Sequence, residues 1–490
     1  MTRQPISAVL AHRARVTPDD MLVTDRTGAA SAAEIDARVT RVARLLLDHD
    51  VRRDDRVVVS LPNGIGFVVA CFAIWRAGAT PLPLSPDLSD DERVALEDIA
   101  EPRAAFGRRP VRPDIAWVDE AQATGLSDDP LPDRWAHSWK APTSSGSTGR
   151  PKVIASSAPA LVDPDAPIAP FVPWQATQLV SSPMWHSTAF TYAFRGLTAG
   201  HRLVIEPAFD ERGFLHAVER HGVTWAVLSP PSIRRLLRMP AQMRRRHDLS
   251  TLASVLHLGG RCPVPDKHAL IDWLGAERVI EVYAGTESNG LTMIGGDEWL
   301  SRPGSVGKPI SNTRIRITAA DGTPAAPGEI GEIWMQRGPD AAYRYLGAPS
   351  RRTRDGWDTL GDLGYLDADG HLFVIDRAAD VIHRNGVTIY PADIEQAFEQ
   401  HPHVRGAVAV GDDTDPPRLT VIVDIADTTV SDAALTEFAT RHLPADHRPD
   451  HICLTHRPLR NDAGKIRRRS LTGCHHPEHS ASLRANGVPA

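Results

Sequence analysis

The sequence has little that would suit a secreted, membrane-spanning or zinc-binding protein. Its four cysteines lie far apart and show no paired spacing for zinc or redox chemistry, so we expect reduced cytosolic thiols. The longest uninterrupted apolar run, residues 67–75, has nine residues, whereas a helix needs about 20 to span a bilayer. The first residues lead into a polar, amphipathic stretch without a signal-peptide core. These absences predict a cytoplasmic protein.

The charge balance excludes another class. Of 490 residues, 55 are lysine or arginine and 61 are aspartate or glutamate, a formal net charge of −6. This mildly acidic balance argues against a dedicated nucleic-acid-binding protein, because such proteins usually carry a net basic face. At roughly 100–200 residues per domain, the length predicts two to four structural units.

Lysine is scarce in this chain. Only five occur, whereas arginine supplies nearly every other positive charge. The two differ at a reactive phosphate or carboxylate, because arginine is a planar fork and lysine a compact charge on a flexible stem. A lysine retained against this bias is therefore a candidate functional residue, and Lys152 and Lys465 lie inside the motifs described below.

Strand and helix patterns alternate over much of the chain. Residues 6–50 are predicted to be helical, with a capping box at Ser31 and Glu34. Strands at 57–61 and 79–84 flank an apolar helix. Such alternation predicts parallel sheets covered by helices.

The alternation recurs at 178–256, after a proline-rich stretch at 159–173 that we expect to be a surface loop or an insertion. Short strands with Asp-Gly turns at 313–374 favour a small antiparallel barrel or sandwich. A compact α+β pattern of about a hundred residues comes next, and a polar tail closes the chain.

The predicted fold class is therefore α/β, with parallel, helix-covered sheets plus a small β-barrel in a large N-terminal domain and a small α+β C-terminal domain. The predicted bounds are 1–378 for the first domain, 379–472 for the second and 473–490 for the tail.

The strongest local motif is a run rich in glycine and hydroxyl residues, Ser144-Ser145-Gly146-Ser147-Thr148-Gly149-Arg150-Pro151-Lys152. Its glycines let the backbone approach an anion, its hydroxyl and N–H groups can donate to phosphate oxygens, and its lysine supplies charge. The spacing is not that of a Walker loop, and composition alone leaves a flexible linker as the alternative.

A second motif, Glu281-Val282-Tyr283-Ala284-Gly285-Thr286-Glu287, follows an apolar run. A strand end that delivers an aromatic ring, a hydroxyl and a carboxylate into one crevice suits a nucleotide with its metal. Tyr283 could stack on a purine, and Glu287 could bind Mg²⁺, which takes oxygen ligands. Taken singly, a tyrosine or a glutamate is more often an ordinary core or surface residue than a ligand of a nucleotide or a metal ion.

A third motif joins Thr359-Leu360-Gly361-Asp362-Leu363-Gly364 with Asp376-Arg377. An aspartate after a strand can accept hydrogen bonds from ribose hydroxyls, and Arg377 could hold the same ribose or a phosphate. The alternative is a turn aspartate and a surface ion pair.

The fourth motif, Asn461-Asp462-Ala463-Gly464-Lys465-Ile466, retains another of the scarce lysines. Its glycine lets a loop tip bend close to a ligand, so that Lys465 could reach the charge on a carboxylate and an α-phosphate. The alternative is a turn with an exposed lysine.

In this order the four motifs resemble the adenylate-forming superfamily of acyl- and aryl-CoA synthetases, peptide-synthetase adenylation domains and luciferases. The resemblance covers nearly the whole chain and includes Tyr390-Pro391-Ala392-Asp393-Ile394-Glu395. It implies an acid–thiol ligase in which a carboxylate and Mg·ATP give an acyl-adenylate and pyrophosphate, and a thiol then displaces AMP.

The resemblance also implies a role for each motif. The run from Ser144 to Lys152 would clamp the β- and γ-phosphates, Tyr283 and Gly260 would flank the nucleotide, and Asp362 with Arg377 would fix the ribose. Thr286 and Glu287 would act at the reacting phosphates, with Glu287 as the Mg²⁺ ligand. Lys465 would bridge carboxylate and α-phosphate in the adenylation half only.

A mobile C-terminal domain is implied as well. It would rotate about Ala379, withdraw Lys465 and bring the loop around Gly386 to a thiolation channel. No carrier-protein domain is present on this chain, so free CoA is the expected thiol and a separate carrier protein the alternative. A homodimer is compatible with the family.

The substrate expectation comes from two further segments. Pro183-Met184-Trp185-His186 matches the place where CoA ligases carry an aromatic or histidine gate, and the run from Gly259 to Pro265 looks most like ligases for fatty, steroid-like or bulky alicyclic acids. A hydrophobic carboxylic acid, whether fatty, aromatic or polycyclic, is therefore expected, with a pocket formed by His186, Trp185, Gly259, Ala284 and Gly285.

The chain departs from the family pattern where glycine is usual, at Val153, at Ala284 and at Arg384-Asn385 before Gly386. An added Cβ is harmful where a positive φ is required. Three interpretations stay open on sequence alone: a full carboxylate–CoA ligase, a relative that performs only the thioester-forming half-reaction, and a non-catalytic nucleotide- or acyl-binding protein.

Overall fold

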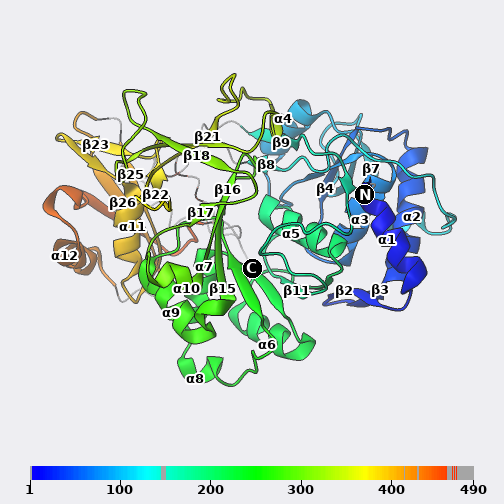
Figure 1. Cartoon of the computed structure of the whole chain (residues 1–490), viewed down its shortest axis with the longest axis horizontal. Helices are drawn as coiled ribbons and strands as arrows, with labels where there is room; N and C mark the ends of the chain where they lie inside the picture. The colour runs from blue at the N-terminus through cyan, green and yellow to red at the C-terminus, as the bar shows by residue number, and fades with distance from the viewer. Residues whose placement is uncertain are drawn as a thin grey trace. The chain divides into compact units, whose positions relative to one another are not determined.

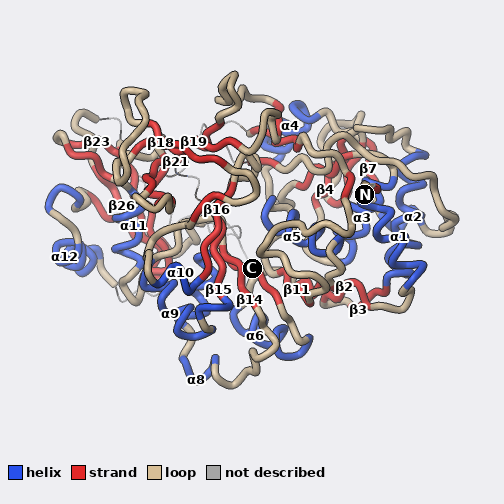
Figure 2. Tube along the Cα trace, in the orientation of Figure 1, coloured by secondary structure: helices blue, strands red, loops and turns tan. Residues whose placement is uncertain are grey.

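The computed structural model describes residues 3–144, 151–412, 414–426, 430–460, 466, 468 and 471. The described residues form two compact units, which Figures 1 and 2 show as ribbon and tube. Unit 1 holds the residues up to 144 together with 151–315 and 335–358, and unit 2 holds 316–334 and those from 359 onward. The domain boundary predicted at residues 378 and 379 falls inside unit 2 and stays a prediction.

Unit 1 contains a nine-stranded sheet in the order β17-β16-β15-β14-β13-β11-β12-β2-β3. Neighbouring strands from β15 to β2 are parallel, and β16, β17 and β3 at the edges are antiparallel to their neighbours. The strands are β2 (Met21–Asp25), β3 (Gly28–Ser31), β11 (Thr177–Val180), β12 (Arg202–Ile205), β13 (Trp225–Leu228), β14 (Ser254–His257), β15 (Val279–Ala284), β16 (Leu291–Gly295) and β17 (Lys308–Pro309).

Helices connect the parallel strands, as the alternating pattern predicts. The helices of unit 1 are α1 (Ile6–Val16), α2 (Ala32–Asp48), α3 (Ile65–Arg76), α4 (Asp90–Ala100), α5 (Ser187–Thr198), α6 (Glu211–His221), α7 (Pro230–Arg238), α8 (Ala241–Arg244), α9 (Val264–Leu274) and α10 (Gly296–Leu300), with 3-10 turns at Glu120–Ala123 and Ala276–Arg278. The capping box of α2 is present as predicted: Ser31 accepts from the Glu34 N–H, and Glu34 accepts from the Ser31 N–H.

Smaller sheets complete unit 1. A parallel sheet has the order β5-β4-β6-β7, an antiparallel sheet has the order β20-β9-β8, and β1 pairs with β10. Their strands are β1 (Gln4–Pro5), β4 (Arg56–Ser60), β5 (Thr80–Pro83), β6 (Ala104–Gly107), β7 (Ala116–Val118), β8 (Thr143–Ser144), β9 (Lys152–Ser156), β10 (Leu161–Val162) and β20 (Tyr343–Leu346).

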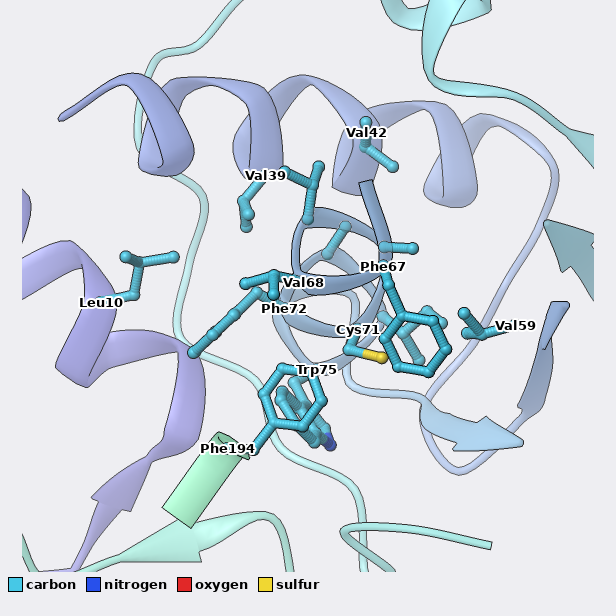
Figure 3. Close-up of a cluster of buried hydrophobic side chains, with 14 of the residues drawn as sticks. Leu10, Val39, Val42, Val59, Phe67, Val68, Cys71, Phe72, Trp75 and Phe194 are labelled. Atoms are coloured by element: carbon cyan, nitrogen blue, oxygen red, sulfur yellow. The ribbon is translucent and has the colours of Figure 1, made fainter. Parts of the chain in front are cut away.

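The apolar run of the sequence forms α3, which is buried on all sides. Of its residues only Gly66 is not fully buried. Figure 3 shows side chains of α3 surrounded by Leu10 of α1, Val39 and Val42 of α2, Val59 of β4 and Phe194 of α5. The Trp75 ring lies 4.9 Å from the Phe194 ring, edge to face, a favourable arrangement for aromatic pairs.

One sequence expectation for unit 1 was wrong. Residues 6–50 are not helical throughout, because β2 and β3 form a hairpin whose turn is held by Asp25: its carboxylate accepts from the N–H and the hydroxyl of Thr27, at 2.8 and 2.6 Å. The proline-rich stretch 159–173, predicted to be a surface loop or an insertion, is buried in part, at Phe171 and Val172.

Unit 2 is an α+β arrangement. It contains a four-stranded sheet in the order β18-β19-β21-β22, the hairpin β23-β24, and the sheet β25-β26-β27 against which α11 packs. Its elements are β18 (Arg314–Thr318), β19 (Gly331–Gln336), β21 (Asp358–Leu366), β22 (Leu372–Arg377), β23 (Ile382–Arg384), β24 (Val387–Ile389), α11 (Pro391–Glu399), β25 (Val404–Gly411), β26 (Leu419–Ile425), α12 (Asp432–His442), a 3-10 turn at Ala445–His447 and β27 (His451–Thr455). Among the helices that the structure describes, none combines the length and apolar character needed to cross a membrane.

Candidate active site

The carboxyl ends of β14 and β15 bring much of the predicted site together. The two strands are parallel neighbours, so the residues that follow them meet at the same edge of the sheet. Gly259 and Gly260 come just after β14, Tyr283 and Ala284 close β15, and the turn 285–287 follows directly. His186 caps α5, in the connection that leaves β11, and β13 lies between β11 and β14 in the sheet. Its Nδ1 accepts from the Thr188 N–H at 3.4 Å.

Glu287 follows β15 at this edge and is 8% exposed. Its Oε1 accepts a hydrogen bond of 2.6 Å from the Tyr345 hydroxyl. The Lys152 Nζ lies 3.8 Å from the same oxygen and 3.7 Å from the centroid of the Tyr345 ring. The arrangement places one carboxylate, one ammonium and one hydroxyl together, which suits a metal ion and phosphate groups.

The predicted phosphate-binding run joins two paired strands. Ser144 ends β8 and lies opposite Lys152, the first residue of β9. Ser145, Gly146, Ser147, Thr148 and Gly149 lie outside the described residues. Val153, which departs from the family's glycine, is fully buried in β9 and packs with the cluster around Val58 and Leu82.

The other departures are also accommodated. Ala284 lies within β15, in extended backbone where a Cβ is tolerated. Asn385 and Gly386 form the tight turn between β23 and β24 with φ of 51° and 77°. Asparagine tolerates the left-handed region better than most residues, so the usual second glycine is not required there.

Unit 2 brings Asp362 and Arg377 together. They are directly opposite each other on the antiparallel strands β21 and β22, and the Arg377 Nε lies 3.3 Å from an Asp362 carboxylate oxygen. Strand pairing therefore fixes the spacing of a buried carboxylate and an exposed guanidinium. Ala379, the predicted hinge, is exposed in a turn closed by the Asp380 N–H donating to the Arg377 carbonyl at 3.0 Å.

An apolar group that we call the aromatic cluster reaches Ala284. It contains Phe171, Tyr192 and Trp225 with the aliphatic residues Val227, Leu256, Leu258 and Val282. The Tyr192 ring, carried by α5, lies edge-on at 5.9 Å from Phe171 and 6.0 Å from Trp225. Trp185 packs against the core cluster that surrounds α3, and its ring lies edge-on at 6.3 Å from the ring of His186.

Sequence reasoning missed Tyr345 and Lys140. Tyr345 is one of only six tyrosines, and Lys140 one of only five lysines, so scarcity was the available signal. Lys140 is 3% exposed, and its Nζ donates to the hydroxyls of Ser187 and Thr191 on α5 at 2.8 and 2.7 Å. Burial, together with the like charge of Arg195, lowers the pKa of Lys140 to about 7.

We expect the lowered pKa of Lys140 to make the free energy of unfolding depend on pH. Its folded pKa of about 7 lies below the ordinary 10.5, so between these values the unfolded chain binds a proton that the folded chain lacks. The free energy of unfolding then rises with pH from 7 toward 10, by up to about 1.4 kcal/mol per pH unit from this residue. Urea unfolding of wild type and Lys140→Met at pH 7, 8 and 9 measures the difference. The wild type should gain stability relative to the variant, and parallel curves would contradict the assignment.

Three buried ionisable side chains meet at strands β14 and β15. The Lys267 Nζ lies 2.5 Å from an oxygen of Glu281 in β15, and His257 of β14 lies 3.8 Å from that same oxygen. All three are at most 5% exposed. Burial raises the pKa of Glu281, and burial followed by the charge of Lys267 lowers the pKa of His257 well below its ordinary value.

Comparison with known proteins decides the family. The chain matches the family model described as AMP-binding enzyme over residues 10–346, more than half of its length. The chain belongs to the AMP-binding enzyme family. Feruloyl-CoA synthase of Amycolatopsis sp is 30% identical to this AMP-binding enzyme over 84% of the chain and 86% of the relative. 2-Succinylbenzoate–CoA ligase of Bacillus licheniformis is 27% identical over 94% of the chain and 98% of the relative.

Solved structures share the fold of this AMP-binding enzyme. The o-succinylbenzoate CoA synthetase of Bacillus subtilis, in complex with its acyl-adenylate intermediate, has a TM-score of 0.81 at 24% identity over 96% of this chain and 98% of that one. The anthranilate CoA ligase AuaEII, in complex with anthranoyl-AMP, has a TM-score of 0.80 at 18% identity over 96% and 97%. The predicted α/β fold class and the predicted superfamily are confirmed.

Proposed function

We propose that this AMP-binding enzyme is a carboxylate–CoA ligase. It activates a hydrophobic, aromatic carboxylic acid with Mg·ATP to an acyl-adenylate and pyrophosphate, and transfers the acyl group to the CoA thiol with release of AMP. The observation that carries the proposal is the placement of Glu287 beside Lys152 and Tyr345 at the carboxyl edge of the large sheet. The names of the relatives, which specify CoA thioesters of aromatic acids, support it.

Adenylation requires two anions to meet. At about 4 Å a carboxylate and a phosphate oxygen repel by ~4 kcal/mol even at an effective dielectric near 20. Lys152 and the run from Ser144 to Gly149 hold the β- and γ-phosphates, and Lys465, which lies outside the described residues, bridges the acid and the α-phosphate. Preorganised cations and donors of this kind lower the barrier by position and charge, without a covalent enzyme nucleophile.

Glu287 fits the role of magnesium ligand. Mg²⁺ takes oxygen ligands, and this carboxylate is buried with the Lys152 ammonium 3.8 Å from one of its oxygens. When bound, the ion neutralises phosphate charge. Thr286 adds a hydroxyl next to this ligand, and Tyr283 with Gly260 borders the nucleotide.

Unit 2 contributes three further roles. Asp362 accepts from the ribose hydroxyls and Arg377 holds their other side, in the register fixed by strand pairing. Ala379 is the hinge of a mobile domain that begins at residue 379. Gly386, which has open space on the side where a Cβ would lie, lines the channel for the pantetheine arm. A separate carrier protein is the alternative thiol donor.

The aromatic cluster indicates the class of acid. Ala284 packs against the cluster that contains Phe171, Tyr192 and Trp225, so a planar ring beside Ala284 would meet an apolar surface while its carboxylate faces the α-phosphate. Aromatic pairs of this geometry add about 0.5–1.5 kcal/mol beyond the burial of area. His186 and Gly259 with Gly285 complete the pocket. Of the fatty, aromatic and polycyclic acids expected from sequence, the proposal keeps the aromatic class.

A panel of acids with ATP, Mg²⁺ and CoA tests the proposal, with AMP release and thioester mass as the readouts. We expect benzoic and hydroxycinnamic acids to exceed fatty acids by at least about tenfold in kcat/KM, since one apolar group alone discriminates by 10- to 200-fold. Thioester formation from synthetic acyl-adenylates alone would instead favour the half-reaction enzyme. Nucleotide binding without either product would leave only a binding protein.

A further inference from the structure

We propose that Tyr345 is a positioning residue that orients the Glu287 carboxylate for the magnesium ion. The inference rests on the proposed function, which makes Glu287 the metal ligand. Neither the four motifs nor the family resemblance pointed to this tyrosine. The geometry around its hydroxyl and its ring carries the argument.

Strand pairing fixes the place of Tyr345. It lies opposite Ile154 in the antiparallel pair of β20 with β9, so its side chain shares a face with Lys152, two residues earlier on β9. The neighbouring pair, Leu346 with Val153, faces the other way and packs in the cluster around Val58 and Leu82. The tyrosine is therefore carried by a sheet whose opposite face is anchored in the core, and not by a free loop.

The hydroxyl and the ring of Tyr345 serve different charged groups. The hydroxyl donates to Glu287 Oε1 at 2.6 Å, which fixes the rotation of the carboxylate. The ring lies 3.7 Å from the Lys152 ammonium, which also forms an ion pair of 3.8 Å with that oxygen. A cation over an aromatic face is stabilised without an anion. Tyr345 thus contacts both charged groups at once, the carboxylate through its hydroxyl and the ammonium through its ring.

Glu287 lies on a turn, where its side chain needs a partner that restricts its rotation. Glu287 precedes Ser288, which has a positive φ of 56°, in a turn closed by the Ser288 N–H donating to the Gly285 carbonyl at 3.0 Å. A glutamate side chain on such a turn has several rotatable bonds, and a positioned ligand needs a partner that restricts them. Tyr345 supplies that partner through a charge-assisted hydrogen bond.

The test compares Tyr345→Phe with wild type in metal binding, measured by the electron paramagnetic resonance signal of free Mn²⁺ with a non-hydrolysable ATP analogue. The phenylalanine keeps the ring beneath Lys152 and removes only the hydroxyl. We expect Mn²⁺ affinity to fall roughly 10- to 100-fold, the usual cost of losing a hydrogen bond to a charged group. Binding of the analogue in EDTA should stay within about twofold, since cation–π contacts survive the change.

Tyr365→Phe is the matched control. Tyr365 lies on β21 in unit 2, and its ring stacks on that of Phe373 at 4.7 Å. This variant should bind Mn²⁺ like wild type. If Tyr345→Phe also binds Mn²⁺ like wild type and only melts at a lower temperature, the tyrosine is merely structural and the inference is overturned.

A third variant separates the inference from the proposed function. Glu287→Gln should weaken Mn²⁺ binding at least as much as Tyr345→Phe. Loss of affinity in Glu287→Gln alone overturns the role of Tyr345 and supports the metal ligand. Unchanged affinity in Glu287→Gln removes the metal assignment itself, and the inference falls with it.

Discussion

Replacing Lys465 by alanine should lower pyrophosphate exchange by roughly 10²- to 10³-fold, the usual cost of removing one preorganised charge from a transition state. The same variant should form thioester from a synthetic acyl-adenylate and CoA at nearly the wild-type rate, because no carboxylate then has to approach the α-phosphate. Radiolabelled pyrophosphate exchange and thioester formation measure the two halves separately.

The exposed Lys308 in β17 provides the matched control for this prediction. Lys308→Ala removes the same charge from the chain and should change neither half-reaction. An equal loss of both halves in Lys465→Ala would show that the lysine supports the fold or binds nucleotide generally. Pyrophosphate exchange by Lys465→Ala at the wild-type rate would show that this lysine has no role in adenylation.

Lys267→Met should destabilise the protein by about 3–5 kcal/mol, the cost of breaking one partner out of a buried ion pair. The change leaves the Glu281 carboxylate buried without the ammonium that lies 2.5 Å from it. Denaturant unfolding followed by circular dichroism measures the loss, and nucleotide affinity should fall as well, because Glu281 lies two residues before Tyr283 in β15.

A double variant separates the buried charge from the packing of the lysine stem. Lys267→Met combined with Glu281→Gln should recover part of the lost stability, since no uncompensated charge remains. If the double variant is no more stable than Lys267→Met alone, then the loss arises from packing against Trp299, whose ring lies 4.9 Å from the ammonium.

Much of the fold could be predicted because it follows from local pattern. The spacing of apolar residues predicted α3, the capping box predicted the start of α2, and the run before Tyr283 predicted β15, all of which the structure contains. Residues placed directly after parallel strands also meet without further information, because topology alone brings the carboxyl ends to one edge.

The hairpin at 21–31 could not be separated from the helices around it. Its strands are only five and four residues long, and its only local signal is the turn formed by Asp25 and Thr27 before Gly28. The burial of Phe171 was hidden for another reason. Proline-rich composition reports backbone conformation, whereas burial depends on Tyr192, which lies in another element.

The partners of charged side chains were the least predictable part of the site. Tyr345 meets Glu287 across 58 residues of sequence, and Lys140 meets Thr191 across 51. No spacing rule connects them, since strand register and helix packing bring them together. Scarcity of lysine marked Lys140 and Lys267 as unusual, and the structure shows that both are buried.

The all-round burial of α3 has a consequence for biosynthesis. Its covering side chains Phe190 and Phe194 are made more than a hundred residues after Arg76. At a translation rate of roughly 5–20 residues per second, the nascent helix waits about 6–24 s before α5 leaves the ribosome. During that interval a strongly apolar surface is available to chaperones, and a message truncated within it would yield an aggregation-prone polypeptide.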